Sequence, residues 1–247
     1  MSVKLGIIQT VSYPSNEYAK DKISHMLESL GKKEADVVCL PEQWLRQNVI
    51  SDFEKEFSQF RKIARNHSLT IIPGAFYEKK SNGYVISSPV IGPNGDIIGK
   101  QEKIHPFDYE KKIVRHGTKA HVFKTKCRFG LIICYDMVFS DVAKLLVKKG
   151  VDVLFSPSRI VRRGLRPWHL YVQVRALENR VPILAANVEN KRFGGKSIVV
   201  DLYENDGVMI PKIKSMLKGQ DFAVSSFNLA KYKKSRSIRY SDVQKFS

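Results

Sequence analysis

Three side chains with useful chemistry follow buried or rigid stretches of the sequence. Glu42 comes directly after an apolar run and the stiff Pro41, and Cys134 ends a second apolar run. Lys103 lies between them in a polar segment that also contains His105. Reactive residues in α/β proteins are usually at strand ends, where the scaffold fixes them and loops give access. Each of these positions is therefore a candidate for a catalytic group.

Glu42 is a candidate general base. A carboxylate held behind a proline at a strand end is partly desolvated, which makes it a usable base near neutrality. Taken alone, a surface glutamate after a turn is the more common situation. Lys103 alone also indicates little in so basic a chain. A histidine such as His105 is more often structural, with its ring bonded to backbone, than catalytic.

Cys134 is a candidate nucleophile because a helix is predicted to begin just beyond it. The positive potential at a helix N-terminus lowers the pKa of a thiol toward the thiolate. The alternative is a buried, inert cysteine, which is common. Cys39 lies inside a predicted strand and is interpreted as packing, whereas Cys127 has no assigned role.

Apolar runs that alternate with amphipathic segments predict the elements that position these residues. Helical spacing predicts one helix that Gly31 ends, one near 51–66, one that follows Cys134 and runs to Lys149, and one opened by Pro167. Gly-Pro-Asn-Gly-Asp, residues 92–96, predicts a hairpin turn. Strands are predicted at 3–9, 36–40, 70–76, 84–91, 96–100, 128–134, 151–155, 181–187, 197–202 and 223–227.

This order of elements predicts a single α/β domain over residues 1–247, with mixed sheets covered by helices and a basic C-terminal tail at about 229–247. The spacing of apolar residues alone does not distinguish a sandwich of two sheets from one large sheet. The 43% hydrophobic and 27% charged residues are typical of a soluble globular protein. No stretch is long and apolar enough for a membrane span, and the N-terminus is interpreted as a first strand and not as a secretory signal.

Three cysteines without a disulfide framework predict a reducing compartment, the cytoplasm. No cysteine or histidine spacing suggests zinc. Lysine and arginine number 42 against 24 acidic residues, a formal net charge of +18. Such an excess is compatible with a nucleic acid or another polyanion as partner. We favour a solvated basic surface, because the cations are scattered and not gathered in one tract with aromatic side chains.

Together and in this order, the three segments resemble the motifs of the nitrilase (carbon–nitrogen hydrolase) superfamily. The base motif is matched by Leu40-Pro-Glu42, the lysine motif by Lys103-Ile-His-Pro-Phe107 and the nucleophile motif by Gly130-Leu-Ile-Ile-Cys-Tyr-Asp136. Further similarity is found in Val3–Gln9, Arg175-Ala-Leu-Glu-Asn179 with Ala186-Asn187, and Gly194–Asp201. The resemblance therefore covers nearly the full chain.

The resemblance implies a four-layer α-β-β-α sandwich, pairing into a homodimer or larger assembly through helices near the nucleophile, and no organic cofactor or metal. It also implies that Cys134 attacks an amide carbonyl as a thiolate. Glu42 takes the thiol proton, passes it to the leaving amine and then activates water against the thioester. Lys103 and the backbone N–H of Tyr135 stabilise the oxyanion. A second acid is expected to hold the lysine, with Glu110 as the candidate and Asp108 as the alternative.

The sequence departs from the resemblance after Cys-Tyr-Asp. Many relatives carry an arginine where this chain has Val138, so a cation expected near the pocket is missing. Four arginines in a later loop are either a substitute anion contact or a solvated basic loop: Arg159, Arg162, Arg163 and Arg166. Trp44, two residues past Glu42, either walls the pocket or packs in the core.

We therefore predict hydrolysis of a small linear amide to a carboxylic acid and ammonia or an amine. N-carbamoyl compounds are rival substrates for the same three residues. Nitrile hydrolysis is less expected, because most of the superfamily acts on amides. Transfer of the acyl group to a second amine stays open, since a thioester can meet a nucleophile other than water. The rival from another class is a non-catalytic protein that binds polyanions, suggested by the net charge of +18.

Overall fold

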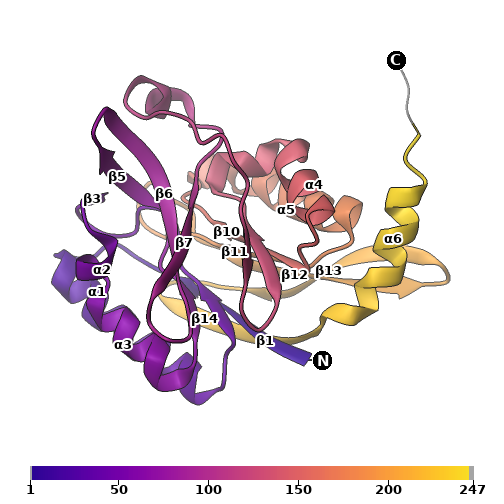
Figure 1. Ribbon diagram of the computed structural model, residues 1–247, viewed down its shortest axis with the longest axis horizontal. Helices are drawn as coiled ribbons and strands as arrows, with labels where there is room; N and C mark the ends of the chain where they lie inside the picture. The colour runs from indigo at the N-terminus through magenta and orange to yellow at the C-terminus, as the bar shows by residue number, and fades with distance from the viewer. Residues whose placement is uncertain (1, 245–247) are drawn as a thin grey trace.

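Two β-sheets form the centre of the computed structural model, which describes residues 2–244 (Figure 1). Within these residues the first sheet has eight strands, in the order β14-β1-β2-β4-β6-β5-β3 with β7 paired to β6. The second has six strands, in the order β13-β12-β11-β10-β9-β8. Both sheets contain parallel and antiparallel neighbours, as the pairs of β1 with β2 and β14, and of β11 with β10 and β12, show.

The strands of the first sheet are β1 (Ser2–Gln9), β2 (Val37–Cys39), β3 (Val49–Ile50), β4 (Thr70–Ile72), β5 (Phe76–Lys80), β6 (Gly83–Ile91), β7 (Ile97–Glu102) and β14 (Asp221–Asn228). Those of the second are β8 (Val122–Lys124), β9 (Arg128–Leu131), β10 (Val153–Pro157), β11 (Ile183–Ala186), β12 (Ile198–Asn205) and β13 (Val208–Met216). The α-helices are α1 (Asn16–Lys32), α2 (Phe53–Glu56), α3 (Ser58–His67), α4 (Ser140–Lys148), α5 (Leu165–Asn179) and α6 (Lys233–Ser241). Short 3-10 helices are η1 (Asp108–Lys112), η2 (Cys134–Val138), η3 (Arg162–Gly164) and η4 (Leu229–Tyr232).

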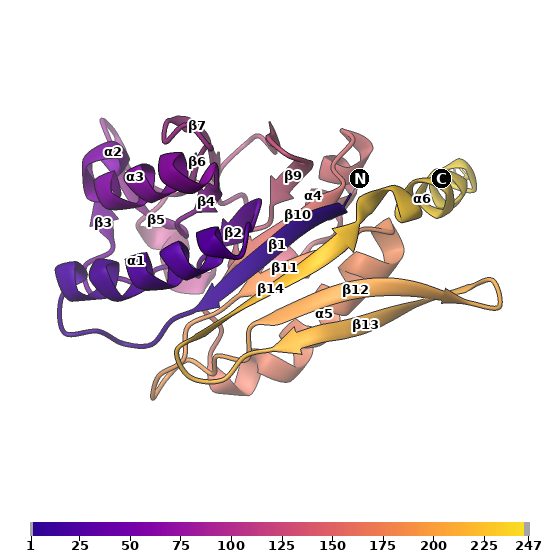
Figure 2. The same cartoon turned by 90° about the horizontal axis from the view of Figure 1, so that it is seen from below.

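Helices cover the outer faces of the two sheets, with α1 and α3 on one side and α5 on the other (Figure 2). The strands show the alternation that two buried faces require. Along β1, Leu5 and Ile7 pack in the cluster between the sheets, whereas Ile8 packs in the cluster beneath α1 and α3. In β2, Cys39 belongs to the first of these clusters and Val38 to the second. The fold is therefore the four-layer α-β-β-α sandwich that the resemblance implied, and not one large sheet.

Two helices were predicted to end at a glycine, and the structure agrees at Gly150 but not at Gly31. Gly31 does not end its helix, because α1 continues to Lys32. A Cβ at Gly31 would lie only 2.4 Å from Cγ of His67, so this glycine lets α1 and α3 approach closely. Gly150 does occupy the predicted position after α4, with φ of +89°. The left-handed backbone that favours glycine is therefore found at Gly150 and not at Gly31.

Two other predicted helices are divided. The helix expected over 51–66 is split at Phe57 into α2 and α3. The helix expected between Cys134 and Lys149 is divided into the 3-10 turn η2 and α4, which begins only at Ser140. The helix α5 begins at Leu165, slightly before the expected Pro167.

The predicted hairpin turn at 92–96 is confirmed, since it joins the antiparallel strands β6 and β7. The partner of β12 in the second hairpin, β13, was not predicted. No residue of β13 is buried, so its sequence lacks an apolar alternation. It also contains Pro211, a residue type that argues against a strand although it pairs here with Leu202. The basic tail forms η4 and α6, with Leu229 and Tyr232 buried; its last residues, 245–247, lie outside the described part of the chain. No helix in residues 2–244 is long and apolar enough to cross a membrane.

Candidate active site

Glu42, Lys103 and Cys134 line one cavity of about 350 Å³. Glu42 follows β2 and Lys103 follows β7, both in the first sheet, whereas Cys134 follows β9 in the second. Residues far apart in the sequence therefore meet where the ends of the two sheets come together. The arrangement brings an acid, an amine and a thiol to a single hollow.

Lys103 is held between two carboxylates at the floor of this cavity. Its side chain is only 1% exposed, and Nζ donates to Glu42 Oε1 at 2.9 Å and to Glu110 Oε2 at 2.8 Å. Glu110 belongs to η1, and its Oε2 also accepts from the backbone N–H of Phe107 at 2.7 Å. Asp108, the alternative second acid, is exposed. Of the two candidates, Glu110 is therefore the one that contacts the lysine.

The surroundings of Lys103 keep its ammonium group charged. Burial alone would lower the pKa of Lys103, but the nearby Glu42, Cys134 and Glu110 outweigh burial and raise it. Burial and the charge of Glu42 raise the pKa of Glu110, against the opposing effect of Lys103. A buried cation with paired carboxylates is a fixed positive charge in a medium that screens it poorly.

Backbone contacts from both sheets fix the segment that carries Glu42. Its N–H donates to the carbonyl of Ser158, beyond β10 in the second sheet, at 3.2 Å. The next residue, Gln43, has φ of +48° and donates to the carbonyl of Ala75 at 2.9 Å. Gly74, with φ of +110°, lies against this turn, and a Cβ there would meet the Pro41 carbonyl oxygen at 2.1 Å. A glycine is therefore required at position 74 for the turn to hold Glu42 in place.

Cys134 lies in a sharp turn with a left-handed backbone, φ of +48°. Such a conformation costs a non-glycine residue on the order of 1–3 kcal/mol and persists only where neighbouring contacts impose it. The N–H of Ile132 donates to the Phe155 carbonyl at 2.9 Å, and that of Asp136 to the Ile133 carbonyl at 3.0 Å. The turn presents the thiol to the cavity although Cys134 is only 8% exposed.

The pKa of the Cys134 thiol is raised, and the expectation of a lowered pKa is wrong. Burial is the largest cause and the neighbouring Glu42 carboxylate the second, while Lys103 and a hydrogen bond from the backbone N–H of Arg159 oppose them. The helix dipole expected here is missing because only a short 3-10 turn follows the cysteine, and α4 begins later, at Ser140. The resting thiol is therefore protonated.

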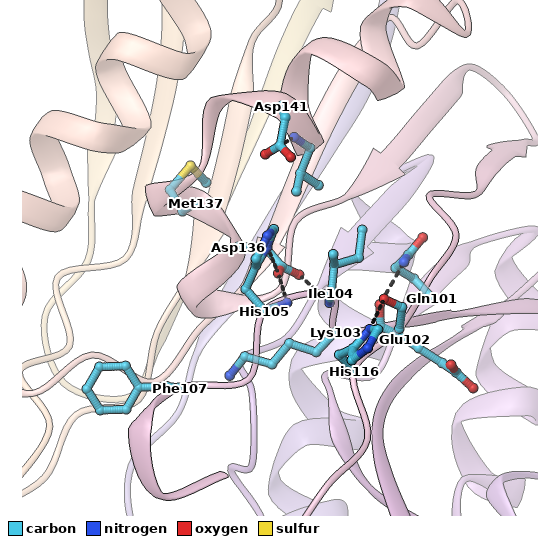
Figure 3. A network of polar contacts seen from close by, with 12 residues as sticks. Gln101, Glu102, Lys103, Ile104, His105, Phe107, His116, Asp136, Met137 and Asp141 are labelled. Atoms are coloured by element: carbon cyan, nitrogen blue, oxygen red, sulfur yellow. Dashed lines mark hydrogen bonds and ion pairs between the residues drawn. The ribbon is translucent and has the colours of Figure 1, made fainter. Parts of the chain in front are cut away.

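Asp136 ties the lysine segment to the nucleophile turn (Figure 3). Its carboxylate is buried and accepts from the backbone N–H of Ile104 at 3.2 Å and of His105 at 2.6 Å. The ring Nδ1 of His105 lies 3.0 Å from the same carboxylate, and the ring stacks on Phe139. His105 is thus structural, as is usual for a lone histidine, but its partner is a side chain and not backbone.

A second brace comes from α5. Arg175 is buried, and its guanidinium donates to the carbonyls of Met137 at 3.2 Å and Val138 at 2.6 Å, directly after the nucleophile turn. No role was predicted for Asp136 or Arg175, although both lie in the motifs that resemble the family. The available signal was a charged residue, Arg175, on the helix face that also carries the buried Val172 and Ala176.

The cavity wall is mainly aromatic and apolar, and two arginines belong to it. Arg159 and Arg163 line the cavity, whereas Arg162 and Arg166 do not. Val138 also lines it, at the position where an arginine was expected. Trp44 does not line the cavity; it packs in the core, stacked on Phe60, with Nε1 donating to the Pro73 carbonyl at 2.7 Å. Of the two roles left open for Trp44, packing is the observed one.

The other cysteines lie outside the cavity. Cys39 is fully buried in β2, burial raises its pKa, and Cys127 is also buried. All three cysteines are free. Among residues 2–244, no group of three or more His, Cys, Asp and Glu side chains is arranged to hold a metal ion.

Comparison with known proteins shows to which family the chain belongs. The sequence model described as carbon-nitrogen hydrolase matches residues 4–211, most of the length. The chain belongs to the carbon–nitrogen hydrolase family. The resemblance to the nitrilase superfamily is thus confirmed. Among sequence relatives of this family, omega-amidase NIT2-B of Xenopus laevis is 26% identical over 204 residues, 74% of each protein. A probable nitrilase of Schizosaccharomyces pombe is 32% identical over 134 residues, 53% of this chain and 49% of the relative.

Solved structures of the carbon–nitrogen hydrolase family share the fold. A carbon-nitrogen hydrolase from Helicobacter pylori G27 superposes with a TM-score of 0.86 at 20% identity, covering 98% of this chain and 95% of that one. Nit3 of Saccharomyces cerevisiae, a member of the nitrilase superfamily, gives a TM-score of 0.84 at 22% identity, with 98% and 96% covered. The two-sheet architecture of this chain is therefore the one found in these solved structures.

Proposed function

We propose that this chain hydrolyses the C–N bond of a small linear amide through a thioester on Cys134, releasing a carboxylic acid and ammonia. One observation carries the proposal: Lys103 Nζ is held between Glu42 and Glu110 on the floor of the cavity that Cys134 also lines. A nucleophile, a base within reach of it and a fixed cation are the groups that covalent amide cleavage requires.

In the first step, Glu42 takes the thiol proton while Sγ of Cys134 attacks the amide carbonyl carbon. A base is needed because the resting thiol is protonated. The new S–C bond forms as one electron pair of the C=O bond moves onto oxygen. The Lys103 ammonium and the backbone N–H of Tyr135 stabilise that oxyanion, and each donor contributes roughly 3 kcal/mol in sites of this kind.

In the second step, the tetrahedral intermediate collapses. Glu42 gives its proton to the amide nitrogen as the C–N bond breaks, so ammonia leaves and the thioester remains. Glu42 then takes a proton from water, whose oxygen bonds to the acyl carbon while the C–S bond breaks. The proton returns from Glu42 to the sulfur of Cys134. One amide and one water become one carboxylic acid and one ammonia.

The proposal is supported by what is known of structural relatives. In a variant of the amidase from Nesterenkonia sp. AN1, the acetamide moiety of fluoroacetamide is covalently added at the active-site cysteine. That amidase shares the fold of this chain, with a TM-score of 0.79 at 17% identity and coverage of 98% and 97%. Relatives named omega-amidase also act on amides. A cysteine nucleophile and an amide substrate are accordingly what we propose here.

The proposal is tested by an ammonia-release assay with a panel of small amides and N-carbamoyl compounds, using Cys134→Ala as the blank. We expect turnover of at least one linear amide by the wild type and none by the folded variant. N-carbamoyl compounds would be cleaved by the same three side chains. If the wild type turned over these compounds and no linear amide, the substrate class would be N-carbamoyl compounds. Salt-sensitive DNA or RNA binding that survives Cys134→Ala, without turnover of any compound by the wild type, would overturn the proposal in favour of a polyanion-binding protein.

We also propose that the enzyme is a homodimer or larger assembly in the cytoplasm. Apolar side chains stand exposed on α4 and α5, beside the nucleophile turn: Leu145, Leu170, Tyr171 and Val174. Exposed apolar groups on adjacent helices are suited to pairing with a second copy. Three free cysteines without a disulfide are what we expect of a protein in a reducing compartment. Light scattering that gives a monomer of 28.2 kDa at all concentrations would contradict the assembly.

A further inference from the structure

Two arginines in the wall of the cavity carry charges that the protein does not neutralise. Arg159 and Arg163 line the same cavity as Cys134. The third cation there, Lys103, is paired with both cavity carboxylates, at 2.9 and 2.8 Å. Within the described residues, neither arginine has a carboxylate within the 4.0 Å of an ion pair. Two positive charges therefore face the cavity without a partner.

Arg159 begins directly beside the reacting sulfur. It follows Ser158 at the end of β10, and its backbone N–H donates to the Cys134 sulfur. Its guanidinium lies 4.7 Å from the ring centroid of Phe193, and Nη2 is 3.4 Å from the Tyr109 hydroxyl. An aromatic face and a neutral hydroxyl position the guanidinium but leave its charge uncompensated.

Arg163 approaches the same space from η3, the turn that leads into α5. Its two arginine neighbours point elsewhere. Arg162 donates to the carbonyls of Asn190 at 2.6 Å and Lys191 at 3.2 Å, away from the cavity. A separate outer groove is lined by Arg162, Arg163 and Arg166, and of these three only Arg163 also lines the cavity. The four arginines are therefore not equivalent, and two of them, Arg159 and Arg163, line the cavity of the nucleophile.

The rest of the cavity lining is mainly apolar. Phe107, Tyr135 and Val138 line the cavity together with Trp168 and Tyr171. A ligand that reaches from Cys134 to the arginines is therefore surrounded mainly by aromatic and aliphatic surface. Val138 offers no charge of its own, so the loop after β10 supplies the cations of this wall.

We propose that Arg159 and Arg163 form a carboxylate-binding subsite, which rests on the amide hydrolysis proposed above and names its substrate class. The substrate is a monoamide whose acyl group runs through a short apolar or aromatic segment and ends in a carboxylate. Its carbamoyl group lies at Cys134 and its carboxylate at the two guanidinium groups. The planar guanidinium fork fits a carboxylate with two parallel hydrogen bonds, which gives strength and orientation.

The first test compares kcat/KM for matched amides that differ in the charged end: para-carbamoylbenzoate against para-toluamide, and adipamate against hexanamide. We expect the wild type to prefer the acid of at least one pair. In Arg159→Gln the ratio of acid to neutral amide should fall about 30-fold or more, because a charged hydrogen-bond partner is lost. Arg166→Gln, in the first turn of α5 and outside the cavity, is the matched control and should keep the ratio. Equal kcat/KM within both pairs, or equal ratios in the two variants, would overturn the subsite.

The second test measures binding without turnover. Cys134→Ala should bind para-carbamoylbenzoate or adipamate at least about 30-fold more tightly than the neutral partner in calorimetry. Arg163→Gln, an exposed position at which misfolding is not expected, should lower the preference about threefold or more. If the wild type hydrolyses no amide, the proposed function fails, while this binding measurement still decides the subsite. Equal binding of acids and neutral amides by Cys134→Ala would reject it.

Discussion

The floor and the wall of the cavity hold their charges in opposite ways. On the floor, Lys103 is 1% exposed and bonded to both Glu42 and Glu110. On the wall, Arg159 and Arg163 reach the same cavity with no carboxylate partner in the described chain. A buried charge must be paired or it destabilises the fold, whereas a partly exposed one can wait for a ligand. This contrast fits our two proposals, in which the floor supplies the fixed charge for catalysis and the wall binds the charged end of the substrate.

The largest expected effect is the loss of activity when Cys134, which lines the cavity, is replaced. Replacement of Cys39, which lies in the core, should not cause this loss. Cys134→Ser should lower kcat/KM by roughly 10⁴-fold or more, because the hydroxyl is a far weaker nucleophile in this setting. Cys39→Ser, at a position with no exposure in β2, should cost about 1–3 kcal/mol of stability and keep the activity. Ammonia release and urea unfolding measure the two quantities. An active Cys134→Ser enzyme would break the distinction.

Removing the floor cation should damage both stability and catalysis. Lys103→Met leaves Glu42 and Glu110 buried without their shared partner, which costs about 3–5 kcal/mol, and kcat should fall about 10²-fold or more. Lys100→Met, on the neighbouring β7, is the matched control. Lys100 is 37% exposed and bonded to Glu78 at 2.7 Å, so its loss should cost about 1 kcal/mol or less. Similar unfolding midpoints for the two variants would contradict the role of the floor.

The second acid should have a smaller effect. Glu110→Gln keeps the shape of the side chain but replaces a charged hydrogen bond to Lys103 by a neutral one, so kcat should fall about 10–100-fold. The amide oxygen can still accept from Phe107, and the fold should remain. Asp108→Asn, in the same turn but exposed, should have wild-type activity. Steady-state kinetics of both variants decide the point, and equal losses would remove Glu110 from its positioning role.

The smallest expected effect concerns the contact between His105 and Asp136, which joins the lysine segment to the nucleophile turn. The hydrogen bond to Asp136 raises the pKa of His105 in the folded protein. Protonated His105 therefore adds stability that is fully present below its unfolded pKa of about 6.5 and is lost as the pH rises through the folded value. The Tm advantage of the wild type over His105→Gln should shrink as the pH rises above about 6.5. An advantage that grows with pH would show that the pair does not act as described.

The sequence was informative where chemistry and backbone coincide in a short segment. Pro41 before Glu42, the turn at 92–96 and the run that ends at Cys134 are local features, and each predicted the element that is present. Glu110 could be named only as one of two acids, because its contact with Lys103 depends on how η1 folds back. Short sequence segments thus predict the candidate catalytic groups better than they predict the residues that hold these groups in place.

The features that sequence reasoning missed all depend on contacts across the fold. The buried Asp136, in the nucleophile turn, binds the backbone of the lysine segment, and Arg175 binds the turn from α5. No local sequence pattern indicates such partners. The strand β13 escaped prediction because it buries no residue. The raised pKa of Cys134 follows from burial and from Glu42, which comes from the other sheet. A helix N-terminus inferred from sequence could not include either influence.

The most direct test of the central claim is to look for the acyl group on the enzyme. A reaction with a linear amide is quenched in acid during turnover, and the peptides are mapped by mass spectrometry. We predict an acyl adduct on the peptide that contains Cys134, removable by hydroxylamine, and none on the peptides of Cys39 or Cys127. An acyl group on a different residue, or continued turnover by Cys134→Ala, would contradict the account.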